Sequence, residues 1–288
     1  MGRATVVAQL NELDRRPAAC RISPGAVDLA ESPDEGSTMA RISQLSRSVS
    51  GKVVLVTGAG SGMGEATAYV FSDEGAKVAA VDQNREPVER VANAITAAGN
   101  TARGWPCDVS DRDAVNRLVA EVVDAFGGLD VLVNNAGISA AVPLEGDGYD
   151  EAWARVLAVN LTAMTYTIRA ALPHLRKSQS PRIINIASTE GLGASPGLSP
   201  YTTAKHGVIG LTRSLAMEFG KEGITVNCIC PGPIRTGMTE SIPEESKEKY
   251  AHQRTALRRY GTPEEVAQMT LSFALPAASF LTGVAVPV

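Results

Sequence analysis

From Lys52 onward, short apolar runs alternate with longer segments in which apolar positions recur every three or four residues. The short runs, rich in Val, Ile and Leu, predict strands buried on both faces, and the periodic segments predict helices. Strands are predicted at 53–57, 77–81, 101–107, 129–133, 182–187, 224–229 and 283–288. Helices are predicted from the glycine-rich stretch 58–64 to about 74, and at 86–98, 111–126, 150–177, 201–219 and 263–275, with irregular last turns near Pro173. This alternation predicts an α/β fold built on a doubly wound parallel sheet.

Residues 1–50 do not follow this pattern. They mix Arg, Pro, Ser, Asp and Glu, and the segment 31–37 breaks any periodicity. We therefore expect a mostly disordered extension at 1–50, with a short helix at 4–15, followed by a single domain at 51–288. The extension lacks the features of a signal peptide or a mitochondrial presequence. The change of composition at Met39 leads to the hypothesis that the native protein starts there.

The overall composition narrows the class of partner. The 288 residues are 44% hydrophobic and 20% charged with a net charge of −4, which gives no basic excess for nucleic acid. No apolar run reaches the roughly 18 residues of a membrane span. The four cysteines, Cys20, Cys107, Cys228 and Cys230, follow no zinc-binding spacing and are expected to be reduced core thiols. We therefore expect a cytoplasmic protein that acts on a small molecule and holds no metal.

The first predicted strand leads directly into a glycine-rich loop and a helix. Glycines let the backbone approach a pyrophosphate closely, and the free N–H groups at a helix N-terminus receive its charge. The strict pattern G-x-G-x-x-G is not met, because the spacing from Thr57 to Gly64 is T-G-x-x-x-G-x-G. The stretch therefore indicates a phosphate-binding loop, with a glycine-rich turn that binds no ligand as the alternative.

Asp82 ends the second predicted strand, about 20 residues after the glycines. A carboxylate there accepts hydrogen bonds from both hydroxyls of an adenosine ribose and repels a 2′-phosphate, which favours NAD over NADP. Arg85, three residues after Asp82, opposes this choice because its positive charge would favour the 2′-phosphate of NADP. Ser61 stands in the loop where an arginine would favour the phosphate.

Tyr201 and Lys205 are separated by one turn of a predicted helix, so their side chains lie on one face. A cation held a few Å away lowers the pKa of a phenol from its free value of about 10, which makes an acid/base group. Two polar residues on a helix face are the alternative reading. Asn160, in an apolar setting, is either a structural hydrogen-bonding group or part of a site.

Taken together, these motifs resemble those of the classical short-chain dehydrogenase/reductase family. The resemblance covers about 51–288 and rests on Thr57-Gly58-x-x-x-Gly62-x-Gly64, Asn134-Asn135-Ala136-Gly137, Asn160, Ser188, Tyr201-x-x-x-Lys205 and Pro231-Gly232, in family order. It implies a single Rossmann-type domain, an α/β doubly wound parallel sheet of about seven strands in the order 3-2-1-4-5-6-7. It also implies a homotetramer or homodimer formed through the helix that carries Tyr201 and Lys205.

The resemblance implies a role for each motif residue. Tyr201 would exchange a proton with the substrate oxygen, Ser188 would hold that oxygen, and Lys205 would bind the nicotinamide ribose and lower the pKa of Tyr201. Asn160 would support a water that links Lys205 to solvent. Cofactor contacts would come from Gly58, Ser61 and Met63 at the pyrophosphate, Asp82 at the adenosine ribose, Asp108 and Val109 at the adenine, Asn135 at the ribose region, and Ile234 with Thr236 at the carboxamide. Gly62, Gly64, Ala136, Gly137, Tyr201, Lys205, Pro231 and Gly232 complete the predicted cofactor-binding set.

Three functions remain open. The first is an NAD(H)-dependent oxidoreductase of secondary alcohols or ketones, the second is an NADPH-dependent 3-oxoacyl-[acyl-carrier-protein] reductase, and the third is a cofactor-binding protein without turnover. The family usually continues past the last strand with an Asp-Gly-Gly segment, and the chain stops at Val288, so a weakened assembly is expected. Substrate choice is expected to lie in the loop after Gly137, in 190–200 and in a lid at 237–259 that carries Met238, Ile242 and Tyr250.

Overall fold

The computed structural model describes residues 42–288, so the expectations for residues 1–41, including a helix at 4–15, and for Cys20 lie outside the described residues. Residues 43–288 form one compact unit. Val49 is 1% exposed, and the Ala277 N–H donates a hydrogen bond of 2.9 Å to the Ser46 carbonyl. The domain therefore begins before the predicted residue 51, because this stretch packs against the body of the domain.

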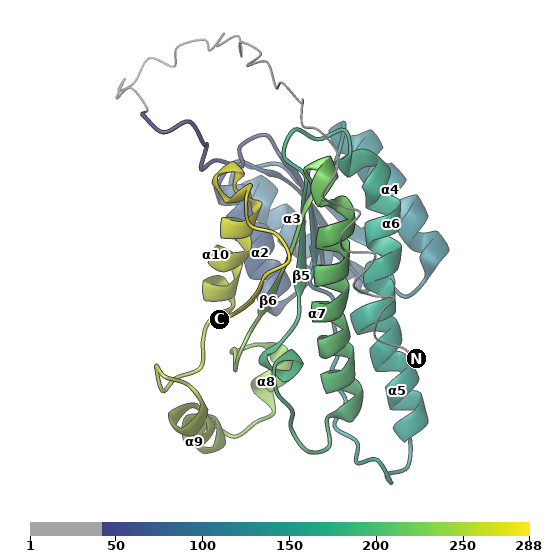
Figure 1. The fold of residues 1–288 in the computed structure, drawn as a ribbon, viewed down its shortest axis with the longest axis vertical. Coiled ribbons are helices and arrows are strands. Elements are labelled where there is room, and N and C mark those ends of the chain that lie inside the picture. The colour runs from purple at the N-terminus through teal and green to yellow at the C-terminus, as the bar shows by residue number, and fades with distance from the viewer. Residues whose placement is uncertain (1–41) are drawn as a thin grey trace, which may run out of the picture. The chain divides into compact units, whose positions relative to one another are not determined.

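Seven parallel strands form one sheet in the order β3-β2-β1-β4-β5-β6-β7, which confirms the predicted fold class (Figure 1). The strands are β1 Val53–Thr57, β2 Lys77–Asp82, β3 Ala102–Pro106, β4 Val131–Asn134, β5 Arg182–Ile186, β6 Thr225–Cys230 and β7 Ala285–Pro287. Each matches a predicted strand, but β7 covers only part of 283–288. As the last strand of the sheet, β7 has a single neighbour, β6, to fix its ends.

Helices cover both faces of this sheet (Figure 1). On one face lie α2 Gly62–Asp73, α3 Arg85–Ala97 and α10 Pro263–Ala274; on the other lie α4 Arg112–Phe126, α6 Ala163–Leu175 and α7 Ser199–Phe219. Within β1, Leu55 belongs to the core under α4, α6 and α7, whereas Val54 and Val56 belong to the core under α2, α3 and α10. Successive side chains of a strand point to opposite faces, so a continuous apolar run serves both cores.

The predicted helix at 150–177 is interrupted. The structure has α5 Tyr149–Leu157, a π-helical turn Ala158–Thr162 and then α6. Pro173 lies inside α6, which ends at Leu175, so the expected irregular end is a short continuation of the helix. The π turn contains Asn160, whose side chain bonds the backbone of another segment, and such insertions are frequent at functional sites.

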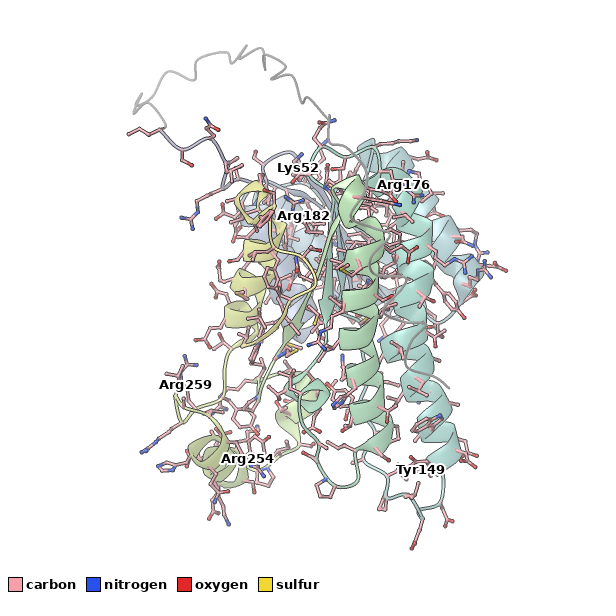
Figure 2. The ribbon with its side chains drawn as sticks, viewed as in Figure 1. Lys52, Tyr149, Arg176, Arg182, Arg254 and Arg259 are labelled. Carbon is pink, nitrogen blue, oxygen red and sulfur yellow. The ribbon has the colours of Figure 1, made fainter. Side chains whose placement is uncertain are left out.

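Two short helices, α8 Gly237–Glu240 and α9 Glu244–Arg254, lie between β6 and α10 beyond the carboxyl ends of the strands (Figure 1). No helix was predicted here, because α9 is mostly charged and has only Lys247 and Ala251 buried. In Figure 2, Lys52 and Arg182, at the starts of β1 and β5, lie at the end of the domain opposite Tyr149, Arg254 and Arg259. Residues 237–254 are called the lid below.

Candidate active site

The loop between β1 and α2 brings backbone into contact with backbone. Gly58 has a φ of 67°, in the left-handed region that favours glycine. A Cβ atom on Gly64 would lie 2.0 Å from the Gly58 carbonyl oxygen. The Asn135 amide donates to the carbonyl oxygens of Thr57 at 2.9 Å and Gly58 at 3.2 Å. The loop therefore has the bare backbone and the helix N-terminus that suit a pyrophosphate.

Asp82 ends β2 beside this loop and is half-buried. Its Oδ2 atom accepts a hydrogen bond from the Gly60 N–H at 3.1 Å, and its Oδ1 atom accepts one from the Asn84 N–H at 3.0 Å. A Cβ atom on Gly60 would lie 2.9 Å from Oδ2, so glycine is needed for this approach. The two backbone bonds fix the carboxylate and leave lone pairs for further donors, such as ribose hydroxyls.

Two cavities, of about 680 and 320 Å³, share Gly58, Asp82, Gln83, Ala136 and Gly137 in their walls. Predicted residues in the wall of the larger cavity are Gly58, Asp82, Asp108, Val109, Ala136 and Gly137. Those in the wall of the smaller cavity are Gly58, Ser61, Gly62, Met63, Asp82, Asn135, Ala136, Gly137, Tyr201, Lys205 and Thr236. The predicted adenosine and nicotinamide regions therefore adjoin at the end of β2.

Six predicted residues lie outside these walls: Gly64, Asn160, Ser188, Pro231, Gly232 and Ile234. Ile234 is 6% exposed and packs in the core under α10. The Pro231 carbonyl accepts from the Thr189 N–H at 2.9 Å, and the Gly232 N–H donates to the Val288 carbonyl at 2.8 Å. Pro231 and Gly232 therefore take part in backbone hydrogen bonds just beyond the end of β6.

The walls also contain residues that sequence reasoning missed. Among them are Gln83 after β2, Ile186 and Ala187 at the end of β5, Arg155 on α5, and Met238 of the lid at a position expected only to cover the substrate. Position at the end of a parallel strand was the available signal for the first three. No sequence pattern marked Arg155, because the break between α5 and α6 was not foreseen.

Lys205 is 3% exposed, and its ammonium donates a hydrogen bond of 2.8 Å to the Ile186 carbonyl. Burial lowers the pKa of Lys205 from 10.5 to about 8. The Lys205 Nζ atom lies 5.5 Å from the centre of the Tyr201 ring. The predicted pairing of the two side chains on one helix face is therefore present in the structure.

The Tyr201 phenol differs from the sequence expectation. Burial raises its pKa above the ordinary value, while hydrogen bonding to Ser188 lowers it and the negative Glu190 raises it. Glu190 also accepts hydrogen bonds from Ser195 at 2.6 Å and from Thr202 at 3.0 Å, which ties the 190–200 loop to α7 beside Tyr201. In the protein alone, burial is therefore the largest influence on the pKa of the phenol.

The Asn160 side chain forms two hydrogen bonds beside the site. Its side chain accepts from the Ile138 N–H and donates to the Ile138 carbonyl, both at 2.8 Å. A Cβ atom on Gly137 would lie 3.4 Å from Asn160 Oδ1 and 3.7 Å from Lys205 Nζ. The Asn160 side chain, carried by the π turn, therefore ties the segment after Gly137 next to the Lys205 ammonium.

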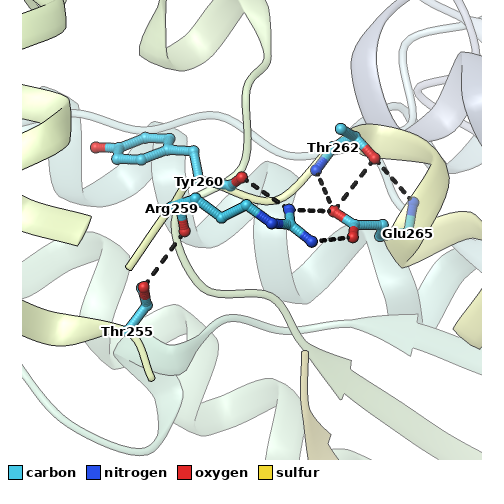
Figure 3. Close-up of polar contacts among 5 residues, drawn as sticks. All are labelled: Thr255, Arg259, Tyr260, Thr262 and Glu265. Atoms are coloured by element: carbon cyan, nitrogen blue, oxygen red, sulfur yellow. Dashed lines mark hydrogen bonds and ion pairs between the residues drawn. The ribbon is translucent and has the colours of Figure 1, made fainter. Parts of the chain in front are cut away.

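Side-chain contacts hold the two ends of the lid. At its start, Arg235 forms a two-pronged ion pair with Glu244. Beyond its end, Arg259 pairs with Glu265, whose carboxylate also accepts from the Thr262 N–H at 2.8 Å (Figure 3). Arg259 and the Thr262 N–H together lower the pKa of Glu265 to about 2. These charged groups are exposed, so the lid is attached by weak contacts.

Within residues 42–288, no group of three His, Cys, Asp or Glu side chains is placed to hold a metal ion. None of the helices in this described part of the chain combines the length and apolar character needed to cross a membrane. Cys107, Cys228 and Cys230 are free and buried.

Comparisons with known proteins agree with this geometry. A family model described as Enoyl-(Acyl carrier protein) reductase matches residues 58–288. The meso-2,3-butanediol dehydrogenase of Serratia marcescens is 40% identical over 82% of this chain and 92% of the relative. A 3-oxoacyl-[acyl-carrier-protein] reductase of Thermotoga maritima is 39% identical over 81% of this chain and 94% of the relative. A crystal structure of a dehydrogenase/reductase from Sinorhizobium meliloti 1021 superposes with a TM-score of 0.79 at 36% identity, covering 84% of this chain and 95% of that one.

A Rossmann-type sheet with a glycine loop and a Tyr-Lys pair defines a class of nicotinamide-dependent oxidoreductases. The chain belongs to the short-chain dehydrogenase/reductase family. Membership implies a nicotinamide cofactor, NAD or NADP, and the glycine loop is shaped to accept its pyrophosphate, since a Cβ atom on Gly64 would collide with the loop backbone.

Proposed function

We propose that this chain is an NAD(H)-dependent oxidoreductase that interconverts a secondary alcohol and a ketone. The observation that carries the choice of NAD is the Asp82 carboxylate, which the N–H groups of Gly60 and Asn84 fix in the wall shared by both cavities. A carboxylate at this place accepts from ribose hydroxyls and repels a 2′-phosphate. The similarity to a butanediol dehydrogenase supports a small alcohol as substrate.

The residues that would hold the dinucleotide lie along the two cavities. The loop backbone of Gly58, Ser61, Gly62 and Met63 would meet the pyrophosphate, Asp82 the adenosine ribose, and Asp108 with Val109 the adenine. Asn135, Lys205 and Thr236 would meet the nicotinamide half. We also propose, from the family resemblance, a cytoplasmic homotetramer or homodimer formed through α7.

When bound, the nicotinamide supplies or accepts the hydride. The Tyr201 phenol gives a proton to the carbonyl oxygen of a ketone, or takes one from an alcohol, while the Ser188 hydroxyl holds that oxygen by a hydrogen bond. Because burial raises the pKa of Tyr201, the phenol needs nearby positive charge to exchange protons near neutrality. Lys205 supplies that charge and binds the nicotinamide ribose, and Asn160 supports the path by which protons reach Lys205 from solvent.

A 3-oxoacyl-[acyl-carrier-protein] reductase that uses NADPH is the second candidate. The 39% identity to the Thermotoga maritima enzyme favours it. The fixed Asp82 carboxylate and Ser61 in the glycine loop favour the first candidate, because neither offers positive charge to a 2′-phosphate.

The cofactor proposal is tested by Asp82→Ala. We expect the wild-type protein to bind NAD+ at least about tenfold more tightly than NADP+, and the variant to lose most of that preference because the 2′-phosphate is no longer repelled. Calorimetric titration of each cofactor into the free protein measures both constants. A wild-type protein that already prefers NADP+, or a ratio that Asp82→Ala leaves unaltered, contradicts the assignment of Asp82.

The catalytic proposal is tested by Tyr201→Phe with a panel of small ketones and diols. We expect kcat to fall by about 10²–10⁴-fold with NADH affinity unchanged, because the ring remains and the acidic proton is lost. Unchanged turnover would refute the acid/base role. Absence of turnover in the wild-type protein on the whole panel would instead favour a cofactor-binding protein without catalysis.

A further inference from the structure

The side chain of Arg90, on α3, contacts the backbone of the glycine loop. The Arg90 Nη2 atom donates a hydrogen bond of 3.0 Å to the Gly60 carbonyl oxygen. The N–H of the same Gly60 donates to Asp82 Oδ2 at 3.1 Å. A single glycine residue therefore separates the Arg90 guanidinium from the carboxylate that we propose binds the adenosine ribose.

The charge of this guanidinium is already matched. Glu65, in the first turn of α2, accepts from Arg90 Nη1 at 2.6 Å and from Arg90 Nη2 at 2.9 Å, and the Tyr69 hydroxyl donates to Glu65 at 2.9 Å. The Arg90 hydrogen bonds lower the pKa of Glu65, so the pair stays charged at neutral pH. The side chain of Arg90 is 54% exposed and that of Glu65 is 20% exposed, so solvent reaches the cation.

We propose that Glu65 is a second determinant of cofactor choice, because it occupies Arg90 and so withholds a guanidinium from the 2′-phosphate of NADP. This inference rests on the proposed function, in which Asp82 selects NAD. A guanidinium fork binds a carboxylate and a phosphate with the same two-pronged geometry, so one partner excludes the other. Removing the Glu65 charge frees a cation beside Gly60, where the ribose of NADP would carry its phosphate.

A neighbouring ion pair on α3 provides a matched comparison. Arg85 pairs with Glu89 at 3.0 Å, and their side chains are 69% and 49% exposed. Among the hydrogen bonds of the described residues, none joins Arg85 to the glycine loop. An ion pair this exposed leaves its cation largely available already, so removal of Glu89 should change little. Both substitutions remove one negative charge from the same side of the domain.

The experiment measures the dissociation constants of NADP+ and NAD+ from the free protein by calorimetry, in an Asp82→Ala background that removes the first determinant. We expect Glu65→Gln to tighten NADP+ binding by about tenfold, the effect of one charge-assisted contact, and to change NAD+ binding by less than about threefold. Gln retains an acceptor for Tyr69. Glu89→Gln should change NADP+ binding by less than about twofold, and adding Arg90→Gln to Glu65→Gln should abolish the gain.

Arg90→Gln in the Asp82→Ala background gives a second readout that does not depend on the Glu65 variant folding. It should not tighten NADP+ binding, because it removes the guanidinium and leaves the Glu65 charge in place. An equal gain from Glu89→Gln, a gain that survives Arg90→Gln, or a gain from Arg90→Gln alone would each overturn the inference. Failure of the proposed function is seen separately, as a wild-type protein without NAD+ preference on which Asp82→Ala has no effect.

Discussion

The glycine loop and the lid meet at the same cavity, yet they are held in opposite ways. The loop depends on backbone contact so close that a Cβ atom on Gly64 would lie 2.0 Å from a carbonyl oxygen. The lid depends on exposed side-chain pairs, Arg235 with Glu244 and Arg259 with Glu265. Buried backbone geometry allows one arrangement, whereas exposed ion pairs form and break at small cost. The glycine loop is therefore fixed by the fold, whereas the lid is held by contacts that can change.

The largest expected effect comes from Gly64→Ala. The added methyl would push the Gly58 carbonyl away and open the phosphate loop, so we expect NAD+ binding to weaken by more than about 100-fold and the free energy of unfolding to fall by about 3 kcal/mol. Calorimetric titration and urea unfolding measure the two effects. Gly210→Ala in α7 is the control, since a Cβ there meets nothing within 4 Å and should stabilise the helix by about 0.5–1 kcal/mol. Normal NAD+ binding by the Gly64 variant would contradict the claim that the loop, unlike the lid, depends on close backbone contact.

An intermediate effect, on the free energy of unfolding, is expected at Lys205, whose buried ammonium lies in the same cavity wall as the glycine loop. Its pKa is about 8 in the folded protein against 10.5 when unfolded, so the unfolded chain binds more protons between these values. Stability from this group is therefore fully present above pH 10.5 and is lost as the pH falls through 8. We expect Lys205→Met to be more stable than the wild type at pH 7, by on the order of 3 kcal/mol.

Urea unfolding at a series of pH values between 7 and 10.5 measures this difference. The gap between Lys205→Met and the wild type should close as the pH rises, because the wild-type ammonium loses its proton. Met is close to Lys in length and leaves the Ile186 carbonyl without its donor at every pH. A gap that stays constant with pH would therefore assign the effect to packing rather than charge.

The smallest effect on stability is expected at the lid. Glu244→Gln breaks the pair with Arg235, and we expect the melting temperature to move by no more than about 2 °C while KM for the alcohol or ketone changes by at least about threefold. Steady-state kinetics at saturating NAD+ measures KM. The control is Glu222→Gln, which breaks a similar pair with Arg176 at the opposite end of the domain (Figure 2). Equal changes in KM for both variants would argue against a lid.

Much of the fold could be predicted because each strand is an apolar run between segments of helical period. The π turn at Ala158–Thr162 escaped prediction, since the residue types there do not distinguish a π turn from an α-helical turn. The lid helices escaped because their side chains face solvent and carry no apolar stripe. The early start of the domain depends on one small apolar contact, Val49, in an otherwise polar stretch.

Some residues of the candidate site could likewise be predicted from the sequence, and others could not. Gly58, Asp82 and Lys205 were found because their chemistry is tied to spacing along the chain. Glu65 and Arg90 are distant in sequence, and charged residues at their positions are ordinary on helix surfaces, so only the fold shows that they share Gly60. The raised pKa of Tyr201 also needed the structure, because burial of the phenol cannot be read from the Tyr-Lys spacing.

The π turn before α6 acts as a phase shift between two halves of one long helix. Each residue of an α-helix advances about 100°, so the extra residue at 158–162 rotates everything after it by roughly that angle relative to an unbroken helix. Arg155 can then face the cofactor cavity while Ile168 and Leu175 face the core. Without the inserted residue, Arg155 could not face the cavity while Ile168 and Leu175 face the core.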